Sequence, residues 1–378
     1  MHPTLSASLR RGHAMTDLLT DVVALTRALI GFDTINPPGR EAPAMRFCQE
    51  LLERAGFACR LIDHGKDRAS LIAVRGPGGG LCFSGHLDTV PLGRAPWSRE
   101  AHGGAVEGDR LYGRGSSDMK GGVAAFLVAA ARSGAPVTVL LTAGEETGCD
   151  GARWLAEAGL LPRVRAMIVG ESTGNRPLAG HKGALWLKLS TEGRTAHGAA
   201  PHLGINAIGL MAPTLARLTG WQPAAHHPRM GRATANLGTI RAGINVNSVP
   251  DLCELTVDLR SVEGVDHAAL AAEARGLCDP AVRVETLLDL PAVWTEPEDP
   301  WFACAAAQVR AVTGPAEGPD CATYFTDASI LKPAMGDPAV MILGPGSVDQ
   351  PHGTDEHVLV SRLAEAVEIY AALIAAGG

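Results

Sequence analysis

Four short apolar segments constrain the fold of this chain most. They are bounded by glycine, proline or charged residues and cover Leu71–Val74, Leu81–Phe83, Val137–Leu141 and Ala166–Val169. Segments this short and this uniformly apolar are typical of strands buried on both faces of a sheet. An alanine-rich helix at about 121–133 and another at Asp150–Ala158 are expected between the later strands. We therefore predict an α/β fold, a largely parallel sheet with helices on both faces.

Apolar residues also recur with helical spacing near the start of the chain. The pattern predicts one amphipathic helix over roughly 16–31 and a second over about 42–55. Residues 1–14 are poorly patterned, and Met15 is an alternative start of the natural protein.

The sequence changes character after Gly180. Leu185, Leu187 and Leu189 alternate with more polar positions, the period of a half-exposed strand. Further elements are expected in the order helix, strand, strand, helix, strand, at about 202–218, 233–241, 252–260, 266–276 and 281–287. This order is that of a ferredoxin-like α+β domain. We therefore expect a discontinuous α/β domain (1–180 and 289–378) with a small α+β domain (181–288) inserted in it.

The composition argues against several classes of function. The 378 residues have a net charge of −7 and no run of Lys or Arg, which disfavours nucleic acid or an anionic membrane as a partner. No segment approaches 18 uninterrupted apolar residues, and no secretory signal follows Arg10 and Arg11. The eight cysteines contain no C-x-x-C pair, so we expect free thiols and a cytoplasmic protein.

Residues that can bind metal follow the predicted strands. In open α/β sheets, functional groups gather beyond the carboxyl ends of strands. The residues at such places, together with one aspartate in a glycine-rich loop, are His86, Asp88, Asp118, Glu145, Glu146, Glu171 and His352. Imidazole and carboxylate ligands without thiolates suit zinc, and also cobalt or manganese.

Two of these residues are expected to act on others of the set. Asp88 lies two residues after His86, so both side chains share a face of an extended chain and the carboxylate can orient the imidazole. Glu145 adjoins Glu146, so one can bind metal while the other takes a proton from a metal-activated water.

Five ordered motifs resemble those of the dizinc deacylase and exopeptidase family, which includes acetylornithine deacetylase, succinyl-diaminopimelate desuccinylase, aminoacylase and glutamate carboxypeptidase. The motifs are Ser84–Pro91, Gly113–Gly121, Gly144–Gly148, Gly170–Thr173 and Gly344–His352. The resemblance implies that Asp118 bridges two Zn²⁺ ions. His86 and Glu171 would complete one site, and Glu146 and His352 the other. It also implies Glu145 as the general base and a cis peptide between Asp118 and Met119.

The resemblance extends to the inserted domain. Its lid segment matches Thr195–Ala207, which makes His197 the group that would stabilise the oxyanion in the active site of a partner subunit. A homodimer through the inserted domain is therefore implied. Asn247 and Arg260 match positions that hold the substrate carboxylate, a task that suits a guanidinium. The alternative for His197 is a loop histidine without a role. The alternative for Arg260 is a surface salt bridge.

The substrate is expected to be a small N-acyl amino acid or a dipeptide. Leu343–Glu356 and Tyr324–Ala328 look closest to the acetylornithine deacetylase branch, and Gly346 and Asp327 are further candidates for substrate binding. Asp327 could hold a cationic side chain or could cap a helix. Ser329 and Ile330 stand where the desuccinylase branch has an arginine, so a succinyl group is less favoured. The alternatives are a dipeptidase, carboxypeptidase or desuccinylase and, outside the family's chemistry, a non-catalytic metal-binding module or a serine hydrolase.

Overall fold

The computed structural model describes residues 15–315, 318 and 320–377, so the extension predicted at 1–14 lies outside the described residues. The chain forms two compact units. Unit 1 comprises Met1–Gly180, Trp294–Ala322 and Thr326–Gly378, and unit 2 comprises His181–Val293 and Thr323–Phe325. Of the described helices, none has the length and apolar character needed to cross a membrane.

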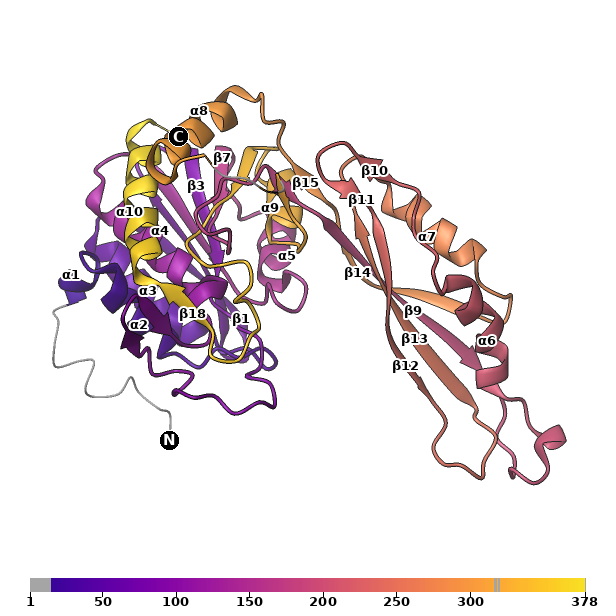
Figure 1. The fold of residues 1–378 in the computed structure, drawn as a ribbon. Helices are drawn as coiled ribbons and strands as arrows, with labels where there is room; N and C mark the ends of the chain where they lie inside the picture. The colour runs from indigo at the N-terminus through magenta and orange to yellow at the C-terminus, as the bar shows by residue number, and fades with distance from the viewer. Residues whose placement is uncertain (1–14, 316–317, 319, 378) are drawn as a thin grey trace. The chain divides into compact units, whose positions relative to one another are not determined.

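Unit 1 is built on a six-stranded sheet (Figure 1). Its strands, in spatial order, are β1 (Ala58–Gly65), β2 (Arg68–Arg75), β6 (Val137–Thr142), β3 (Gly79–His86), β7 (Val164–Val169) and β17 (Ala339–Ile342). The last four pair in parallel, and β2 runs antiparallel to both of its neighbours. The predicted largely parallel sheet is confirmed, and each apolar segment named above lies within one of its strands.

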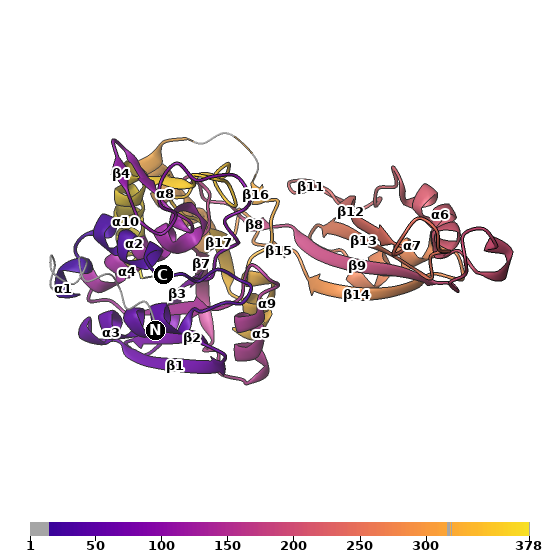
Figure 2. The same ribbon diagram turned by 90° about the horizontal axis from the view of Figure 1, so that it is seen from below.

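Helices cover both faces of this sheet. They are α1 (Met15–Leu18), α2 (Val22–Ile30), α3 (Ala42–Arg54), α4 (Gly121–Arg132), α5 (Asp150–Glu157), α8 (Pro300–Thr313), α9 (Ala328–Ala334) and α10 (Val360–Ala375). Figures 1 and 2 show α4 and α10 on one side of β3 and β7, and α5 and α9 on the other. Phe83 of β3 packs on Phe126 of α4 and Tyr370 of α10, with ring centroids 5.5 and 5.1 Å apart.

The single helix predicted over 16–31 is wrong, because the chain turns before Val22. The Asp21 carboxylate accepts hydrogen bonds from the backbone N–H groups of Val23 and Ala24, and it therefore begins a new helix there.

A second, smaller sheet joins distant parts of unit 1. It contains β18 (His357–Leu359), β5 (Arg110–Tyr112) and β4 (Val106–Glu107), all antiparallel. The pairing of β18 with β5 brings the segment after His352 beside the segment that leads into Asp118.

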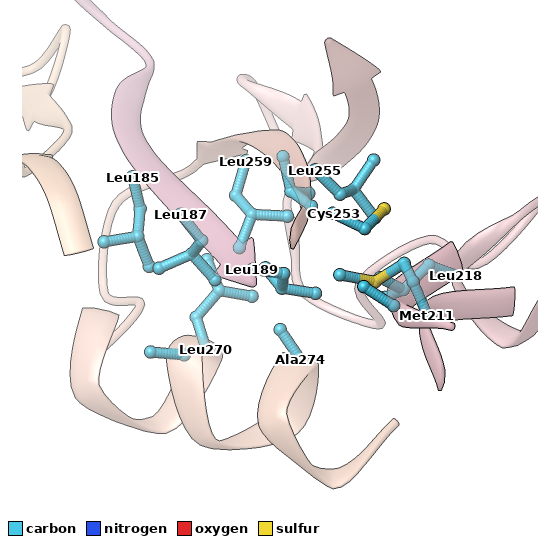
Figure 3. Packing of buried hydrophobic residues seen from close by; sticks show 13 residues of the cluster. Leu185, Leu187, Leu189, Met211, Leu218, Cys253, Leu255, Leu259, Leu270 and Ala274 are labelled. Atoms are coloured by element: carbon cyan, nitrogen blue, oxygen red, sulfur yellow. The ribbon is translucent and has the colours of Figure 1, made fainter. Parts of the chain in front are cut away.

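Unit 2 contains a four-stranded antiparallel sheet with two helices. The sheet order is β12 (Thr234–Ala242), β13 (Leu252–Ser261), β9 (Gly183–Glu192) and β14 (Arg283–Leu290), and the helices are α6 (Ala207–Leu218) and α7 (His267–Gly276). The chain order β-α-β-β-α-β confirms the predicted ferredoxin-like arrangement. Figure 3 shows the core, in which Leu185, Leu187 and Leu189 of β9 lie beside residues from both helices.

Short elements complete the chain. They are β8 (Gly180–His181), the 3₁₀ turn η3 (Pro201–Leu203), β10 (His226–His227), β11 (Gly231–Arg232), β15 (Val293–Trp294) and β16 (Cys321–Ala322). The boundary expected at 288/289 falls inside β14, where Leu290 still pairs with Ala184. The second crossing lies at 293/294, three residues beyond the end of β14. All eight cysteines are free thiols.

Candidate metal centre

The candidate ligands meet beyond the carboxyl ends of the parallel strands in unit 1. His86 is the last residue of β3, Glu145 and Glu146 follow β6, and Glu171 follows β7. Asp118 lies in the short segment η2 (Ser116–Lys120), directly before α4, where its own backbone is non-helical (φ −117°, ψ 94°) and the peptide between Asp118 and Met119 is cis. His352 lies in the loop between β17 and β18. Parallel strands place their carboxyl ends at one edge, which explains the convergence.

Asp118 lies between the two histidines. Its Oδ1 is 3.3 Å from His86 Nε2, and its Oδ2 is 3.4 Å from His352 Nε2. His86 Nε2 is also 3.3 Å from Glu171 Oε1, and His352 Nε2 is 3.1 Å from Glu146 Oε2. The structure therefore brings together the two groups expected from the sequence, with one oxygen of Asp118 turned toward each.

The donor set fits metal ions. Ligand atoms of His86, Asp118 and Glu146 lie within 4.8 Å of one another. Among the described residues, His86 Nε2 and Glu146 Oε1 are buried without a hydrogen-bond partner, a costly arrangement unless something binds there. Burial, and then repulsion by Asp118, raises the pKa of Glu146 and of Glu171 to about 7. Cations between these carboxylates would remove the repulsion.

Glu145 lies beside this group. Its Oε2 is 4.0 Å from His86 Nε2, and the side chain is buried. Burial raises the pKa of Glu145 well above its usual range, and the carboxylates of Glu171 and Glu146 raise it further against the opposing effect of His86. A buried carboxyl group next to a metal-binding cluster is suited to accept and return a proton.

The Asp88 carboxylate was expected to orient the His86 imidazole, but the structure gives its backbone carbonyl that contact. His86 Nδ1 lies 3.0 Å from the backbone carbonyl of Asp88 and 3.5 Å from its carboxylate, so the carbonyl is the better placed acceptor. The Asp88 carboxylate accepts instead from the backbone N–H groups of Glu145 (3.1 Å) and Glu146 (3.2 Å) and from Asn36 Nδ2 (3.0 Å). The carboxylate therefore holds the backbone after β6 while one of its oxygens stays beside the His86 ring.

Asn36 was not predicted. Nothing in its local sequence marks it, since its role comes from a contact with a residue 52 positions later.

Asp327 and Gly346, both candidates for substrate binding, are enclosed. Thr142 Oγ1 donates a hydrogen bond to Asp327 Oδ2, and the Asp327 side chain makes no capping bond at the start of α9. The alternative of a helix cap is therefore wrong. At Gly346, a Cβ atom would lie 2.4 Å from the Ser117 carbonyl oxygen and from Ser172 Oγ, so only glycine fits between the loops that carry Asp118 and Glu171.

Gly170–Gly174 has the G-x-S-x-G spacing typical of serine hydrolases. Ser172 is buried, and its hydroxyl donates a 2.8 Å hydrogen bond to the Ser117 carbonyl. The hydroxyl thus joins two ligand loops, a geometry that disfavours a nucleophilic role.

His197 and Asn247 lie side by side in unit 2. Gly198 donates its backbone N–H to the Asn247 carbonyl at 2.7 Å, and His197 forms a β-bridge with Ser248. His197 Nδ1 accepts a 3.0 Å hydrogen bond from the Ala199 backbone N–H, and its side chain is exposed. In the neutral imidazole the proton must then be on Nε2, which leaves that N–H as an outward donor.

Arg260 lies at the end of β13 in the same unit. Its Nε and Nη2 donate to Asp258 Oδ2 at 3.2 and 3.1 Å, and Trp186 Nε1 donates to the other oxygen of Asp258. The guanidinium carbon lies 5.7 Å from the centre of the Phe325 ring. Arg260 therefore makes the ion pair named as its alternative, while its planar face rests on an aromatic ring.

Comparisons with known proteins match most of the chain in sequence and in fold. The acetylornithine deacetylase of Edwardsiella ictaluri is 31% identical over 91% of this chain and 94% of its own length, and that of Myxococcus xanthus is 30% identical over 96% and 98%. The fold is that of an M20 family metallo-carboxypeptidase from Sulfolobus solfataricus (TM-score 0.77, 16% identity, 93% and 98% covered). It is also that of a dinuclear metal-binding M20 peptidase from Bacillus subtilis (TM-score 0.69, 15% identity, 94% and 97% covered).

The family model agrees with these relatives. It is described as peptidase family M20/M25/M40 and matches residues 82–376, most of the chain. With this match and the curated relatives above, the chain belongs to the M20 family of metal-dependent hydrolases, whose members named here are deacetylases and peptidases.

Proposed function

We propose that this enzyme hydrolyses the amide bond of an N-acyl amino acid, as an acetylornithine deacetylase does. The observation that carries the proposal is Asp118, with one oxygen facing His86 and Glu171 and the other facing His352 and Glu146. A carboxylate shared in this way is suited to bind two divalent metal ions, one through each oxygen. The curated relatives named acetylornithine deacetylase support the substrate class.

The ligands in this proposal are the five residues grouped around Asp118. Two divalent ions, Zn²⁺ by the chemistry of the donors and Co²⁺ or Mn²⁺ as substitutes, would polarise the acyl carbonyl and lower the pKa of water.

The protons are moved by the chain itself. The carboxylate of Glu145 accepts a proton from the attacking water and returns it to the nitrogen of the departing amino acid. Burial keeps this carboxylate away from bulk water, and the Asp88 carboxylate fixes its backbone.

His197 is proposed to stabilise the oxyanion in the active site of a partner subunit. Its exposed side chain and its Nδ1 acceptor bond support this, because Nε2–H can donate to a developing negative charge. A homodimer through unit 2 is part of the proposal. Support for it comes from β12, an edge strand whose Ile240 is exposed and which is followed by Ile244 and Val246, at 84% and 104% exposure.

Arg260 and Asn247 are proposed to hold the substrate carboxylate. A guanidinium with a face on Phe325 keeps its edge for a bidentate contact, provided that the substrate displaces Asp258. The acyl group is proposed to be small and uncharged, because Ser329 and Ile330 offer no cation. We also propose a reducing compartment such as the cytoplasm, which suits the free cysteines.

A dipeptidase or carboxypeptidase is the second candidate, and a desuccinylase the third. Solved structures with the same fold include human carnosine dipeptidase 1 and a tripeptidase from Staphylococcus aureus. Because these are under 25% identical to this chain, they support the fold and leave the substrate to experiment.

The test is a substrate panel with metal-loaded enzyme. N-acetyl, N-formyl and N-succinyl amino acids are compared with dipeptides, and kcat/KM should be highest for an N-acetyl or N-formyl amino acid. A preference for dipeptides would contradict the deacylase assignment. Glu145→Gln should lose nearly all turnover while keeping two metal ions per subunit, and a fully active variant would contradict the role of Glu145.

A further inference from the structure

Glu356 is a buried carboxylate whose hydrogen bonds all lead to the loop of Asp118. Its Oε1 accepts from the backbone N–H groups of Ser117 (2.8 Å) and Asp118 (3.0 Å). Its Oε2 accepts from the backbone N–H of Gly115 (3.0 Å) and from Arg114 Nη1 (2.7 Å). Each oxygen thus receives two donors, and three of the four are main-chain groups at or just before Asp118.

Arg114 extends the same arrangement to the loop of His352. Besides Glu356, its guanidinium donates to the carbonyls of Pro91 (3.1 Å) and His352 (3.5 Å), and its planar face lies 5.1 Å from the Trp97 ring. Both side chains of the ion pair are almost completely inaccessible, at 1% and 0% exposure.

The pair joins two segments that are far apart in the sequence and that each carry a proposed ligand. Glu356 follows His352 by four residues, and Arg114 precedes Asp118 by four. The backbone reinforces this link, since Gly113 donates its N–H to the Glu356 carbonyl at 2.8 Å.

We propose that Glu356, with Arg114, is the positioning residue that sets Asp118 and His352 at the separation needed to bind two metal ions. The inference rests on the proposed function, because it takes Asp118 and His352 as ligands. Glu356 acts through the backbone of Asp118: amides held by a carboxylate fix the direction of the Asp118 side chain before metal arrives. A loop without this carboxylate would have to be ordered by the metal itself, which would weaken binding.

The competing explanation is that the pair only stabilises the fold. Unit 1 offers a matched pair for comparison, Glu41 and Arg68. Glu41 is also fully buried and receives Arg68 Nη2 at 2.8 Å and Nε at 3.2 Å. Its hydrogen bonds lead to this guanidinium and not to the amides of a ligand loop. Replacing either glutamate by glutamine therefore removes a buried charge. Only the replacement of Glu356 also disturbs hydrogen bonds from the backbone amides around Asp118.

The experiment compares Glu356→Gln with Glu41→Gln in the full chain. Glutamine keeps the shape but turns an NH₂ group toward two hydrogen-bond donors. Co²⁺ affinity of the metal-free protein is measured by competition with a chelator, and the visible absorption spectrum of bound Co²⁺ reports the ligand geometry. We expect Glu356→Gln to bind Co²⁺ about 10–100-fold more weakly, with a changed spectrum. Glu41→Gln should keep the wild-type affinity and spectrum even if it unfolds at lower urea.

Wild-type affinity and spectrum in Glu356→Gln would overturn the inference, as would an equal loss in Glu41→Gln. If Glu356→Gln does not fold, Arg114→Lys replaces it. Lysine keeps a charge for Glu356 but not the fork that reaches Pro91 and His352, so an unchanged affinity in that variant would overturn the inference too. Failure of the proposed metal site has a different signature, since the wild type itself would then bind no Co²⁺. Failure of the proposed substrate class would leave Co²⁺ binding intact and appear only in the substrate panel.

Discussion

The carboxylate of Asp88 accepts a 3.1 Å hydrogen bond from the backbone N–H of Glu145. Asp88, two residues after the end of β3, therefore positions the backbone of the proposed general base, which follows β6. Because the neighbouring amide of Glu146 also donates to Asp88, one buried carboxylate fixes the backbone of both glutamates. Residues at the ends of adjacent strands thus position one another, and each depends on the register of the sheet.

Asp88→Asn tests this relationship. The amide of asparagine presents two hydrogens to a site where three groups already donate, so at least one backbone bond is lost. We expect kcat to fall by about 10–100-fold at saturating metal, with the metal content unchanged.

The control for this variant is Thr147→Ala. It removes the other hydrogen-bond partner of Asn36 and leaves the bonds to Asp88 intact, so its kcat should match that of the wild type. A wild-type kcat in Asp88→Asn would show that Glu145 does not depend on this carboxylate.

The local sequence indicates these strand-end residues as candidates but not the contacts between them. His86, Glu146 and Glu171 were identified because a buried strand is a local pattern and its carboxyl end has a known use. Asn36 and Glu356 belong to the same site, yet each acts through residues far away in the chain. No periodicity encodes such a contact. β1 has a different explanation, because its residues are exposed or half-buried and form no continuous apolar segment of the kind that marks the other strands.

His197 is predicted to act on the active site of the partner subunit. His197→Ala should lower kcat by about 10²–10³-fold with little change in KM, the usual effect of removing an oxyanion donor. A heterodimer of this variant with Glu145→Gln should have roughly half of the wild-type activity, because one of its two active sites is intact. The measurement is activity of the purified two-tag heterodimer. A heterodimer as inactive as either parent would mean that His197 does not act across the subunits.

Arg260 is predicted to determine affinity for the substrate carboxylate. Lysine keeps the charge but loses the bidentate fork and the planar contact with Phe325. Arg260→Lys should therefore raise KM by about 10-fold or more, while kcat changes less. The preference of the wild type for a free carboxylate over its carboxamide should shrink in the variant. Arg275→Lys, an exposed arginine on α7, is the control and should leave KM unchanged. Equal KM values in all three proteins would remove Arg260 from the substrate site.

His181, at the first crossing between the units, is predicted to make stability depend on pH. Burial lowers its pKa from the usual 6.5 to about 4, and its Nε2 has no hydrogen-bond partner among the described residues. The unfolded chain therefore binds a proton at a higher pH than the folded chain does. The neutral, buried ring makes its full contribution to the free energy of unfolding above pH 6.5. This contribution is lost as the pH falls toward about 4, a difference of about 3 kcal/mol.

His181→Asn removes this titration while keeping a donor for the Lys182 carbonyl, which His181 Nδ1 contacts at 2.9 Å. Urea unfolding of both proteins is measured at pH 7 and pH 5 with the metals removed. The free energy of unfolding of the wild type should fall more steeply between these two values than that of the variant, because only the wild type has an imidazole that the unfolded state protonates first. Removing the metals matters, since acid also protonates the ligands, which are the same in both proteins. Parallel losses in the two proteins would show that His181 is accessible to protons in the folded state, and that its burial does not set the acid sensitivity of the fold.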